Sequence, residues 1–171
     1  MCSQGLIRRY TITITKGDSI HHPQHGIGTV QSIRKRSFSG PKGRKFAKIF
    51  FPREDLVMMV RERDLEGTIR KPIKKSVAQK VLVHISDWSE SVSDQWKVRA
   101  SVQQKKLDDG DVFALAEVYK TLSLRQQSDN LSAADRRQLS QSQQCLSEQL
   151  AVALDRPLGK VSMNMEEAVL G

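Results

Sequence analysis

The chain is organised around the stretch Asp94-Gln-Trp-Lys-Val-Arg-Ala-Ser-Val-Gln-Gln-Lys-Lys-Leu-Asp-Asp-Gly-Asp111 and its continuation from Val112 to Leu122. The spacing of its apolar residues predicts a helix from about Ser93 to Leu107, an Asp-Asp-Gly break, and a second helix from about Asp111. The second helix is expected to bury one stripe, made of Val112, Leu115, Val118, Tyr119 and Leu122. Two helices joined by so short a break are typical of a helical bundle.

Trp96 lies at the start of the first of these helices, among polar and basic residues. One interpretation makes its ring the first core anchor of the helix, roughly in line with Ala100 and Leu107. The other makes it a flat apolar ring that wedges against nucleic acid while Lys97 and Arg99 hold phosphates. The residues alone leave both interpretations open.

Further helices are predicted on both sides of this stretch. From Ser76 the period is helical, with one stripe made of Val77, Val81, Ile85 and Trp88. A later helix begins at Ser132, a candidate N-cap with Asp135 three residues on, and its inward residues are Leu139, Leu146, Leu150 and Leu154. Arg156-Pro157 ends this helix, and Met165–Leu170 is expected as a last short helix or a loose tail.

The N-terminal half has the pattern of short strands joined by tight turns. Residues 10–15 alternate with period two, which places Tyr10, Ile12 and Ile14 on one face. The other predicted strands and turns are strands at 19–22, 26–33, 46–51 and 56–60, turns at 16–18 and 52–55, and a hairpin loop at 39–43. The glycines at 26 and 28 permit a bulge or a close backbone approach. Such strands favour a small, strongly bent, barrel-like sheet.

Charge is distributed unevenly along the chain. Residues 1–75 carry 17 Lys or Arg against 6 Asp or Glu, whereas residues 76–171 carry 11 against 13, so the net +9 arises in the first half. A basic half joined to a near-neutral helical half suggests a partner that is anionic or has an acidic surface. A merely soluble basic protein would have the same balance, so charge alone does not identify the partner.

Composition disfavours several classes of protein. Cys2 and Cys145 lie far apart in the chain and indicate neither a disulfide framework nor a cysteine-type zinc site. No apolar run approaches the roughly 20 residues of a membrane span, and the first residues lack the apolar segment of a signal peptide. We therefore expect a cytoplasmic protein with no membrane association.

Residues suited to catalysis are sparse. The histidines of His21-His-Pro-Gln-His25 lie close together, but the proline argues against a helix and no further ligand is evident, so no metal site is expected. Gly26-Ile-Gly28 lacks the third glycine and the following helix of a dinucleotide site. Because spacing suggests no catalytic triad either, we expect a binding protein without a cofactor rather than an enzyme.

Two groups of residues, in matching order and spacing, carry a resemblance to a known family. The first is Gly17-Asp18-x-Ile20-x-x-Pro23-x-His25-Gly26-x-Gly28-x-Val30. The second comprises Trp96, Leu107-x-x-Gly110-Asp111-Val112, Ala116-Glu117-Val118, Leu131-Ser132-Ala133, Arg137, Leu139 and Glu148-Gln149-Leu150-Ala151. Together they cover most of residues 15–154 and resemble the CarD/CdnL-type bacterial transcription regulators, whose N-terminal module is shared with transcription-repair coupling factor. Residues 1–9 extend beyond the usual start of that family.

The resemblance implies a Tudor-like N-terminal domain that docks on the β subunit of RNA polymerase and a helical domain that contacts promoter DNA. In such proteins a tryptophan wedges into the minor groove at the upstream edge of the transcription bubble and stabilises the open complex. Trp96 matches that wedge, and Trp88 is then the core tryptophan. Phosphate contacts would come from basic residues of the same helix, which are Lys97, Arg99, Lys105 and Lys106. For each of these four, a solvated helix face is the alternative.

On the polymerase side, the family carries a functional arginine soon after the Gly-x-Val strand. Arg36 falls at that place, with Arg34 and Lys35 beside it. A second family arginine falls at Met59, and Arg61 lies two residues on, on the same strand face. These five residues are the predicted polymerase contacts, and Met59 departs from the family pattern.

The sequence therefore predicts an α+β protein with a Tudor-like bent β-barrel followed by a helical bundle. The expected divisions are a polymerase-interacting domain at 1–70, a linker at 71–76, and a DNA-contacting helical domain with a C-terminal tail at 77–171. The protein is expected to be a monomeric, nucleoid-associated regulator. The main alternative is a plain adaptor whose basic half binds an acidic protein or RNA, and an enzyme that uses the histidines is a more distant one.

Overall fold

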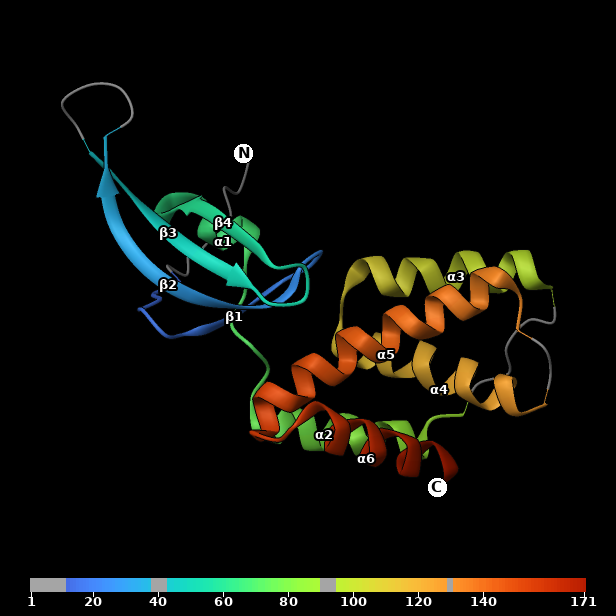
Figure 1. Ribbon diagram of the computed structural model, residues 1–171. Coiled ribbons are helices and arrows are strands. Elements are labelled where there is room, and N and C mark those ends of the chain that lie inside the picture. Colours follow the sequence, from blue (N-terminus) through green and yellow to red (C-terminus); the bar gives the residue numbers. More distant parts are fainter. Residues whose placement is uncertain (1–11, 38–42, 90–94, 129–130) are drawn as a thin grey trace, which may run out of the picture. The chain divides into compact units, whose positions relative to one another are not determined.

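The computed structural model describes residues 12–37, 43–89, 95–128 and 131–171 (Figure 1). The chain divides into two compact units, Met1–Lys71 and Pro72–Gly171. The described part of the first unit is a four-stranded antiparallel sheet with short helical turns, and that of the second is helical. The predicted α+β class is confirmed. Each unit has an apolar core of its own.

The four strands of the sheet lie in chain order. They are β1 (Ser19–His22), β2 (Gly26–Arg36), β3 (Arg44–Phe51) and β4 (Leu56–Arg61). Each strand pairs antiparallel with the next, and Figure 1 shows β2 and β3 as long, curved strands. Alternating residues form the core, among them Ile20, Val30, Ala47, Ile49, Phe51 and Val60. The predicted strands at 19–22, 26–33, 46–51 and 56–60 are thus confirmed.

Two local features shape β2. A Cβ atom on Gly28 would lie 2.6 Å from the Phe51 ring, so only glycine lets that ring pack against the strand. The register with β3 shifts between Val30 and Ser32, which puts the bulge at Gln31 rather than at a glycine. The expected close approach is confirmed, and the bulge has a different position.

The predicted strand at 10–15 is wrong in the part that the structure describes. Residues 12–15 form no strand, and Tyr10 lies outside the described residues. Ile14 is nevertheless buried in the sheet core. The Thr15 amide donates to the Asp18 carboxylate at 2.7 Å, and Gly17, with φ of 95°, donates to Val30. The first of these hydrogen bonds closes a local turn at residues 15–18 before a longer strand can form. Of the hairpin loop expected at 39–43, only Gly43 is described.

Two short helical segments that the sequence did not indicate close the first unit. They are η1 (Glu62–Asp64) and α1 (Leu65–Thr68). Leu65 and the following Ile69 are buried in the sheet core. Arg70 then pairs with His21 in an isolated antiparallel bridge, which ties the end of the unit to its first strand.

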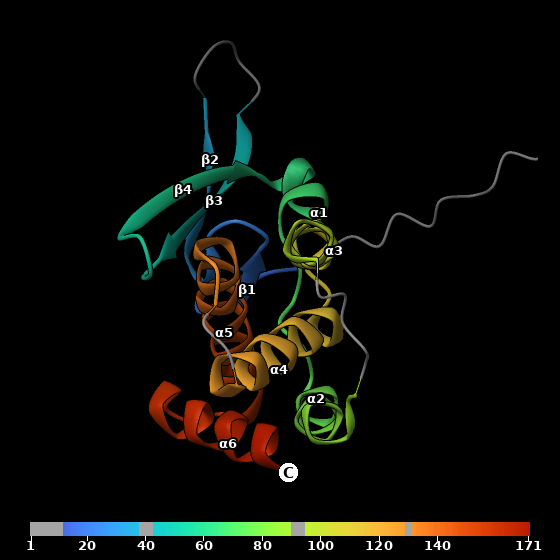
Figure 2. The same ribbon diagram turned by 90° about the vertical axis from the view of Figure 1, so that its right-hand side faces the viewer.

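The second unit consists of α2 (Lys75–Asp87), α3 (Trp96–Asp109), α4 (Val112–Ser128), α5 (Ala133–Leu154) and α6 (Leu158–Leu170). Figures 1 and 2 show α4 and α5 in the middle, α3 on one side of them, and α2 and α6 on the other. The predicted stripe of α4 is buried throughout, and the capping box between Ser132 and Asp135 is present. Both predictions are confirmed.

The C-terminal segment is a full helix rather than a short one or a loose tail. α6 begins at Leu158, seven residues before the predicted start, and follows Pro157 directly. Val161, Met165 and Val169 lie at helical spacing and are buried in the bundle core. The residues around Met165 therefore complete the bundle.

Candidate nucleic-acid interface

Trp96 is the first residue of α3, and its side chain is 53% exposed. It shares a side of the helix with Ala100 and the buried Leu107. Side chains of a helix tilt toward its N-terminus, so a ring on the first residue projects past the helix end instead of packing beneath it. The core-anchor interpretation of Trp96 is therefore wrong, and the wedge interpretation stays a prediction.

The Trp96 ring borders a surface depression with a cavity volume of about 640 Å³. The other walls are Arg99, Arg125 and residues 131–135, where α5 begins. The Lys97 ammonium lies 5.6 Å from the centroid of the Trp96 ring. An exposed ring with a cation over it and a concave surface beside it offers a nucleobase both stacking area and positive charge.

The basic residues predicted beside Trp96 have different surroundings. Lys97 and Lys105 are exposed. Arg99, in contrast, is 3% exposed, and its Nε and Nη2 atoms lie 3.3 and 3.0 Å from the two carboxylate oxygens of Asp135. Its guanidinium is thus held inside the bundle, so Arg99 is poorly placed for the phosphate contact that the resemblance implies.

Asp135 is fixed as firmly as its arginine partner. Its carboxylate accepts hydrogen bonds from the Ser132 hydroxyl at 2.8 Å and the Ser132 amide at 3.3 Å, while the Ser132 hydroxyl accepts from the Asp135 amide at 3.1 Å. Burial alone would raise the pKa of Asp135, but the hydrogen bonds from Arg99 and Ser132 outweigh burial and lower that pKa. The carboxylate therefore stays ionised and paired.

Lys106 is likewise engaged within the bundle. Its ammonium donates to Glu117 on α4 at 2.7 Å and lies 5.3 Å from the centroid of the Trp88 ring. Trp88, just after α2, is half-buried and also packs against His84, which contacts the same Glu117. This cluster joins α2, α3 and α4, so Lys106 has a structural role in addition to any contact with DNA.

Sequence reasoning missed two exposed apolar residues on the outer face of α3. Val98 and Val102 lie four residues apart and are both exposed, and Lys105 follows on the same side. A helical projection of residues 96–109 would have found them, because they lie opposite Leu107. The outer face of α3 is therefore apolar and basic.

The five residues predicted to contact polymerase are all in the sheet. Arg34, Lys35 and Arg36 form the exposed end of β2. Strand register places Arg34, Phe46 and Arg61 side by side across β2, β3 and β4, with Ser32, Lys48 and Met59 in the row two residues on. Met59 is 41% exposed on β4, which is an edge strand among the described residues. Arg34, Met59 and Arg61 thus share one outer face, whereas Lys35 alternates to the other.

The histidines of the first unit have structural partners. The buried His21 accepts a hydrogen bond from the Arg70 guanidinium at 3.0 Å, and burial, with Arg70 beside it, lowers its pKa to about 4. His25 lies 2.7 Å from Glu54, and its ring centroid is 4.6 Å from that of His22. Within the described residues, no group of three His, Cys, Asp or Glu side chains is arranged to hold a metal ion.

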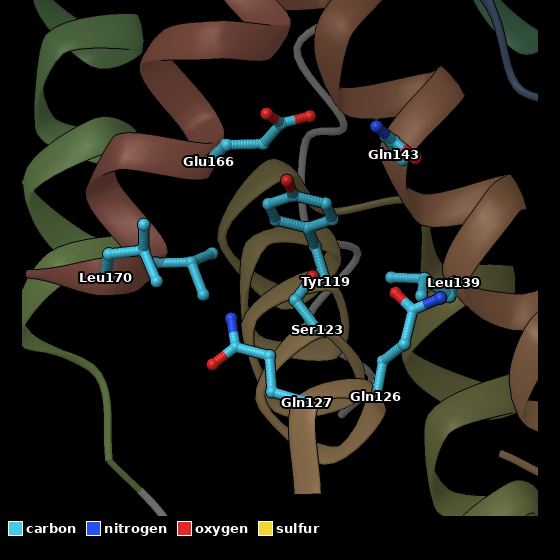
Figure 3. Close-up of a pocket in the computed structure, with 9 residues that line it drawn as sticks. Tyr119, Ser123, Gln126, Gln127, Leu139, Gln143, Glu166 and Leu170 are labelled. Atoms are coloured by element: carbon cyan, nitrogen blue, oxygen red, sulfur yellow. The ribbon is translucent and has the colours of Figure 1, made fainter. Parts of the chain in front are cut away.

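A second cavity, of about 310 Å³, lies among α4, α5 and α6 (Figure 3). The Tyr119 hydroxyl points toward Glu166, and burial raises the pKa of this phenol. The rest of the lining is Ser123, Gln126, Gln127, Leu139, Gln143, Val169 and Leu170. It contains none of the predicted site residues and shares no lining residue with the depression beside Trp96.

None of the helices in the described part of the chain combines the length and the apolar character needed to cross a membrane.

The helical unit, with its exposed tryptophan at a helix start, corresponds to a known family. The family model "CarD, C-terminal domain" matches residues 80–166, half of the chain, and the chain belongs to this family. The chain is also 27% identical over 139 residues to the "Putative transcription factor YdeB" of Bacillus subtilis (strain 168), a match that covers 80% of this chain and 89% of that protein. The resemblance to CarD/CdnL-type regulators is confirmed, and membership points to transcription regulation rather than catalysis.

Proposed function

We propose that this CarD-type regulator binds the β subunit of bacterial RNA polymerase and stabilises the promoter open complex. The sheet unit, about 1–70, is the polymerase-interacting and Tudor-like domain in this proposal, 71–76 is the linker, and 77–171 contacts DNA at the upstream edge of the bubble. The protein acts as a monomer, associated with the nucleoid. The observation that carries the proposal is the exposed Trp96 ring at the start of α3 in a chain of this family.

The ring favours open DNA for a physical reason. Inserting an aromatic side chain into an intact duplex requires unstacking, which costs a few kcal/mol per base step. At the edge of a bubble the stacking is already lost, so the Trp96 ring gains apolar contact there without that cost. A protein that binds the open state more tightly than the closed one shifts the equilibrium by that difference in affinity.

Lys97 and Lys105 are the proposed phosphate contacts on α3. Both are exposed, and Lys97 lies next to Trp96 in the chain. Contacts to phosphate position a protein without reading base sequence, so the proposal predicts broad promoter use with little sequence preference. Binding through two or more such contacts weakens as salt is raised, because releasing counterions from the DNA into a more concentrated salt solution gains less free energy.

The polymerase contact is proposed at the outer face of the sheet and the end of β2. Arg34, Arg36 and Arg61 supply positive charge around the half-buried Phe46, and Met59 adds an exposed apolar surface. Lys35, on the opposite side of β2, extends the basic end of the strand. Met59 in place of the family arginine makes the contact less dependent on charge at that point.

The proposed wedge is tested by Trp96→Ala. Removal of one stacking ring costs roughly 1–3 kcal/mol, so the gain in open-complex lifetime is expected to fall about tenfold. The measurement is the lifetime of a heparin-challenged open complex on a linear promoter fragment. Polymerase binding, measured by co-purification with the β subunit, is expected to stay unchanged.

Met163→Ala is the matched control for the wedge experiment. It removes another exposed apolar side chain of the same unit, on α6 rather than α3, and should leave the lifetime unchanged. A folded Trp96→Ala protein that prolongs the open complex as well as the wild type does would refute the wedge. Activity that survives both this change and high salt would favour the adaptor alternative.

A further inference from the structure

The helix that bears Trp96 is attached to the bundle mainly through polar groups. Its buried residues are Arg99, Gln103 and Leu107, and only Leu107 belongs to the apolar core. The Gln138 amide on α5 donates to the Ala100 carbonyl at 2.9 Å, which adds a further polar contact between α3 and α5. Polar contacts therefore determine where the first half of α3 lies.

The strongest of these contacts is the pair between Arg99 and Asp135. Two hydrogen bonds join the guanidinium edge to the carboxylate, and both side chains are almost fully buried. Asp135 is itself held by Ser132 in the first turn of α5. Because each partner is fixed by its own helix, the pair sets the position of the start of α3 relative to the start of α5.

A buried ion pair adds little to the free energy of folding, but it can fix the relative orientation of the two helices that it joins. Desolvation of the two charges offsets most of their attraction, and an apolar pair of similar volume is often equally stable. Apolar contacts tolerate sliding and rotation, whereas a two-point hydrogen-bonded fork fixes both. The pair is thus better suited to orienting α3 than to stabilising the bundle.

The orientation matters most at Trp96. Arg99 lies one turn after it, and the Arg99 amide donates to Gln95, which precedes the ring. Gln95 is the N-cap of α3 and makes no side-chain capping bond. Trp96, Arg99 and Asp135 all line the same depression. A rotation of the first turn of α3 would therefore swing the indole across that depression.

We propose that Arg99, through its buried pair with Asp135, is a positioning residue that holds the Trp96 ring in the direction needed to contact open DNA. The inference rests on the proposed function. Arg99 itself contacts no DNA in this scheme, in contrast to the role expected for it from the sequence.

The test uses the full chain with the double substitution Arg99→Met and Asp135→Leu, which replaces the buried charges by apolar side chains. The protein is expected to remain helical by circular dichroism and to keep binding polymerase. Its gain in open-complex lifetime should fall about three- to tenfold, as if part of the stacking contact were lost. In a Trp88→Phe background, the fluorescence anisotropy of Trp96 should fall because the ring becomes more mobile.

Two comparisons separate positioning from simple stability. Val161→Ala weakens the core at α6, away from α3, and below its melting temperature should leave both lifetime and anisotropy unchanged. Arg99→Lys keeps the charge but loses the fork, so it should lower both readouts although the ion pair can still form. Full recovery by lysine would overturn the inference, since charge alone would then suffice.

The inference requires the lifetime and the anisotropy to change together in the double variant. Provided that Trp96→Ala itself shortens the lifetime, a change in only one of them, or in neither, overturns it. If Trp96→Ala does not shorten the lifetime, the proposed wedge fails, and the anisotropy alone then decides whether Arg99 orders the ring.

Discussion

His21 shows how one buried side chain makes the stability of a unit depend on pH. It lies on β1, accepts a hydrogen bond from Arg70, and is almost fully buried. Burial, together with the nearby Arg70 charge, lowers its pKa from 6.5 to about 4. The folded protein therefore holds this imidazole neutral at pH values where the unfolded chain would protonate it.

This difference in pKa predicts acid sensitivity of the sheet unit. Between about pH 6.5 and 4 the unfolded state binds more protons at His21, so the free energy of unfolding falls as the pH is lowered through that range. The loss is on the order of 2–3 kcal/mol. Urea titrations at several pH values, followed by the amide NMR signals of Ala47 and Ile49, would measure it.

His21→Asn is expected to be less stable near neutral pH, because the smaller amide side chain fills the buried site of the ring less completely. It should nevertheless show a shallower decline in stability toward acid. Gln24→Asn is the control, since Gln24 is exposed in the turn after β1 and carries no titratable group, and it should keep the wild-type slope. Equal slopes for His21→Asn and the wild type would show that another group controls the acid response.

Also at the residue scale, side-chain type was a poor guide to burial on α3. The sequence predicts that Trp96 lies on the same side of the helix as Ala100 and Leu107, and it does. The ring is nevertheless exposed, because Trp96 is the first residue of α3. The resemblance implies an exposed Arg99 that contacts phosphate, yet Asp135, distant by 36 residues, gives it a buried ionic partner. Such long-range pairing has no signal in a single sequence.

At the element scale, α6 packs on the bundle through apolar residues at helical spacing. Met165 is fully buried in the bundle core, whereas Met163, two residues away, is 61% exposed. Met165→Ala should therefore lower the free energy of unfolding by about 2–5 kcal/mol, because it removes buried surface and leaves a cavity.

The same substitution at Met163 should change stability by less than about 0.5 kcal/mol. Urea denaturation followed by helical circular dichroism compares the two variants directly. Similar losses at both positions would mean that α6 does not pack on the bundle with the face that contains Val161, Met165 and Val169.

Most elements could be predicted because periodicity reports burial. The apolar run at residues 46–51 falls within β3, and the stripe from Val112 to Leu122 is the buried face of α4. The failures have local causes. Residues 12–15 alternate like a strand, but the hydrogen bonds between Thr15 and Asp18 turn the chain there. The segments η1 and α1 are too short to show a period. The predicted last helix starts too late, at Met165, because the first residues of α6, Leu158-Gly-Lys160, include only one apolar side chain.

At the scale of the whole molecule, the proposal assigns one task to each unit. The sheet and the helical bundle have separate cores, and a short segment around Lys71 and Pro72 joins them. A tether of this length raises the effective concentration of the second contact once the first is made. Binding to polymerase would therefore bring α3 to the bubble even if its own affinity for DNA is low.

This division predicts opposite defects from changes in the two units. Arg36→Glu reverses a charge at the exposed end of β2 and should weaken co-purification with the β subunit about tenfold or more, as charge reversals at complementary interfaces do. Direct DNA binding at low salt should stay near the wild-type level, because the proposed DNA contacts lie on the helical unit.

Lys80→Glu is the matched charge reversal for Arg36→Glu. It lies exposed on α2 in the other unit, so it should leave polymerase binding unchanged. Co-purification that is unaffected by Arg36→Glu would count against the proposed docking face, whatever the outcome for Trp96.

The buried fork between α3 and α5 also constrains how this protein can evolve. Losing either the guanidinium or the carboxylate strands its partner as an unpaired buried charge, so a first mutation at either position is costly although a completed exchange of both need not be. A lasting change at these two positions would therefore tend to replace both residues together. Positions 99 and 135 are accordingly expected to drift slowly and in concert among descendants of this chain.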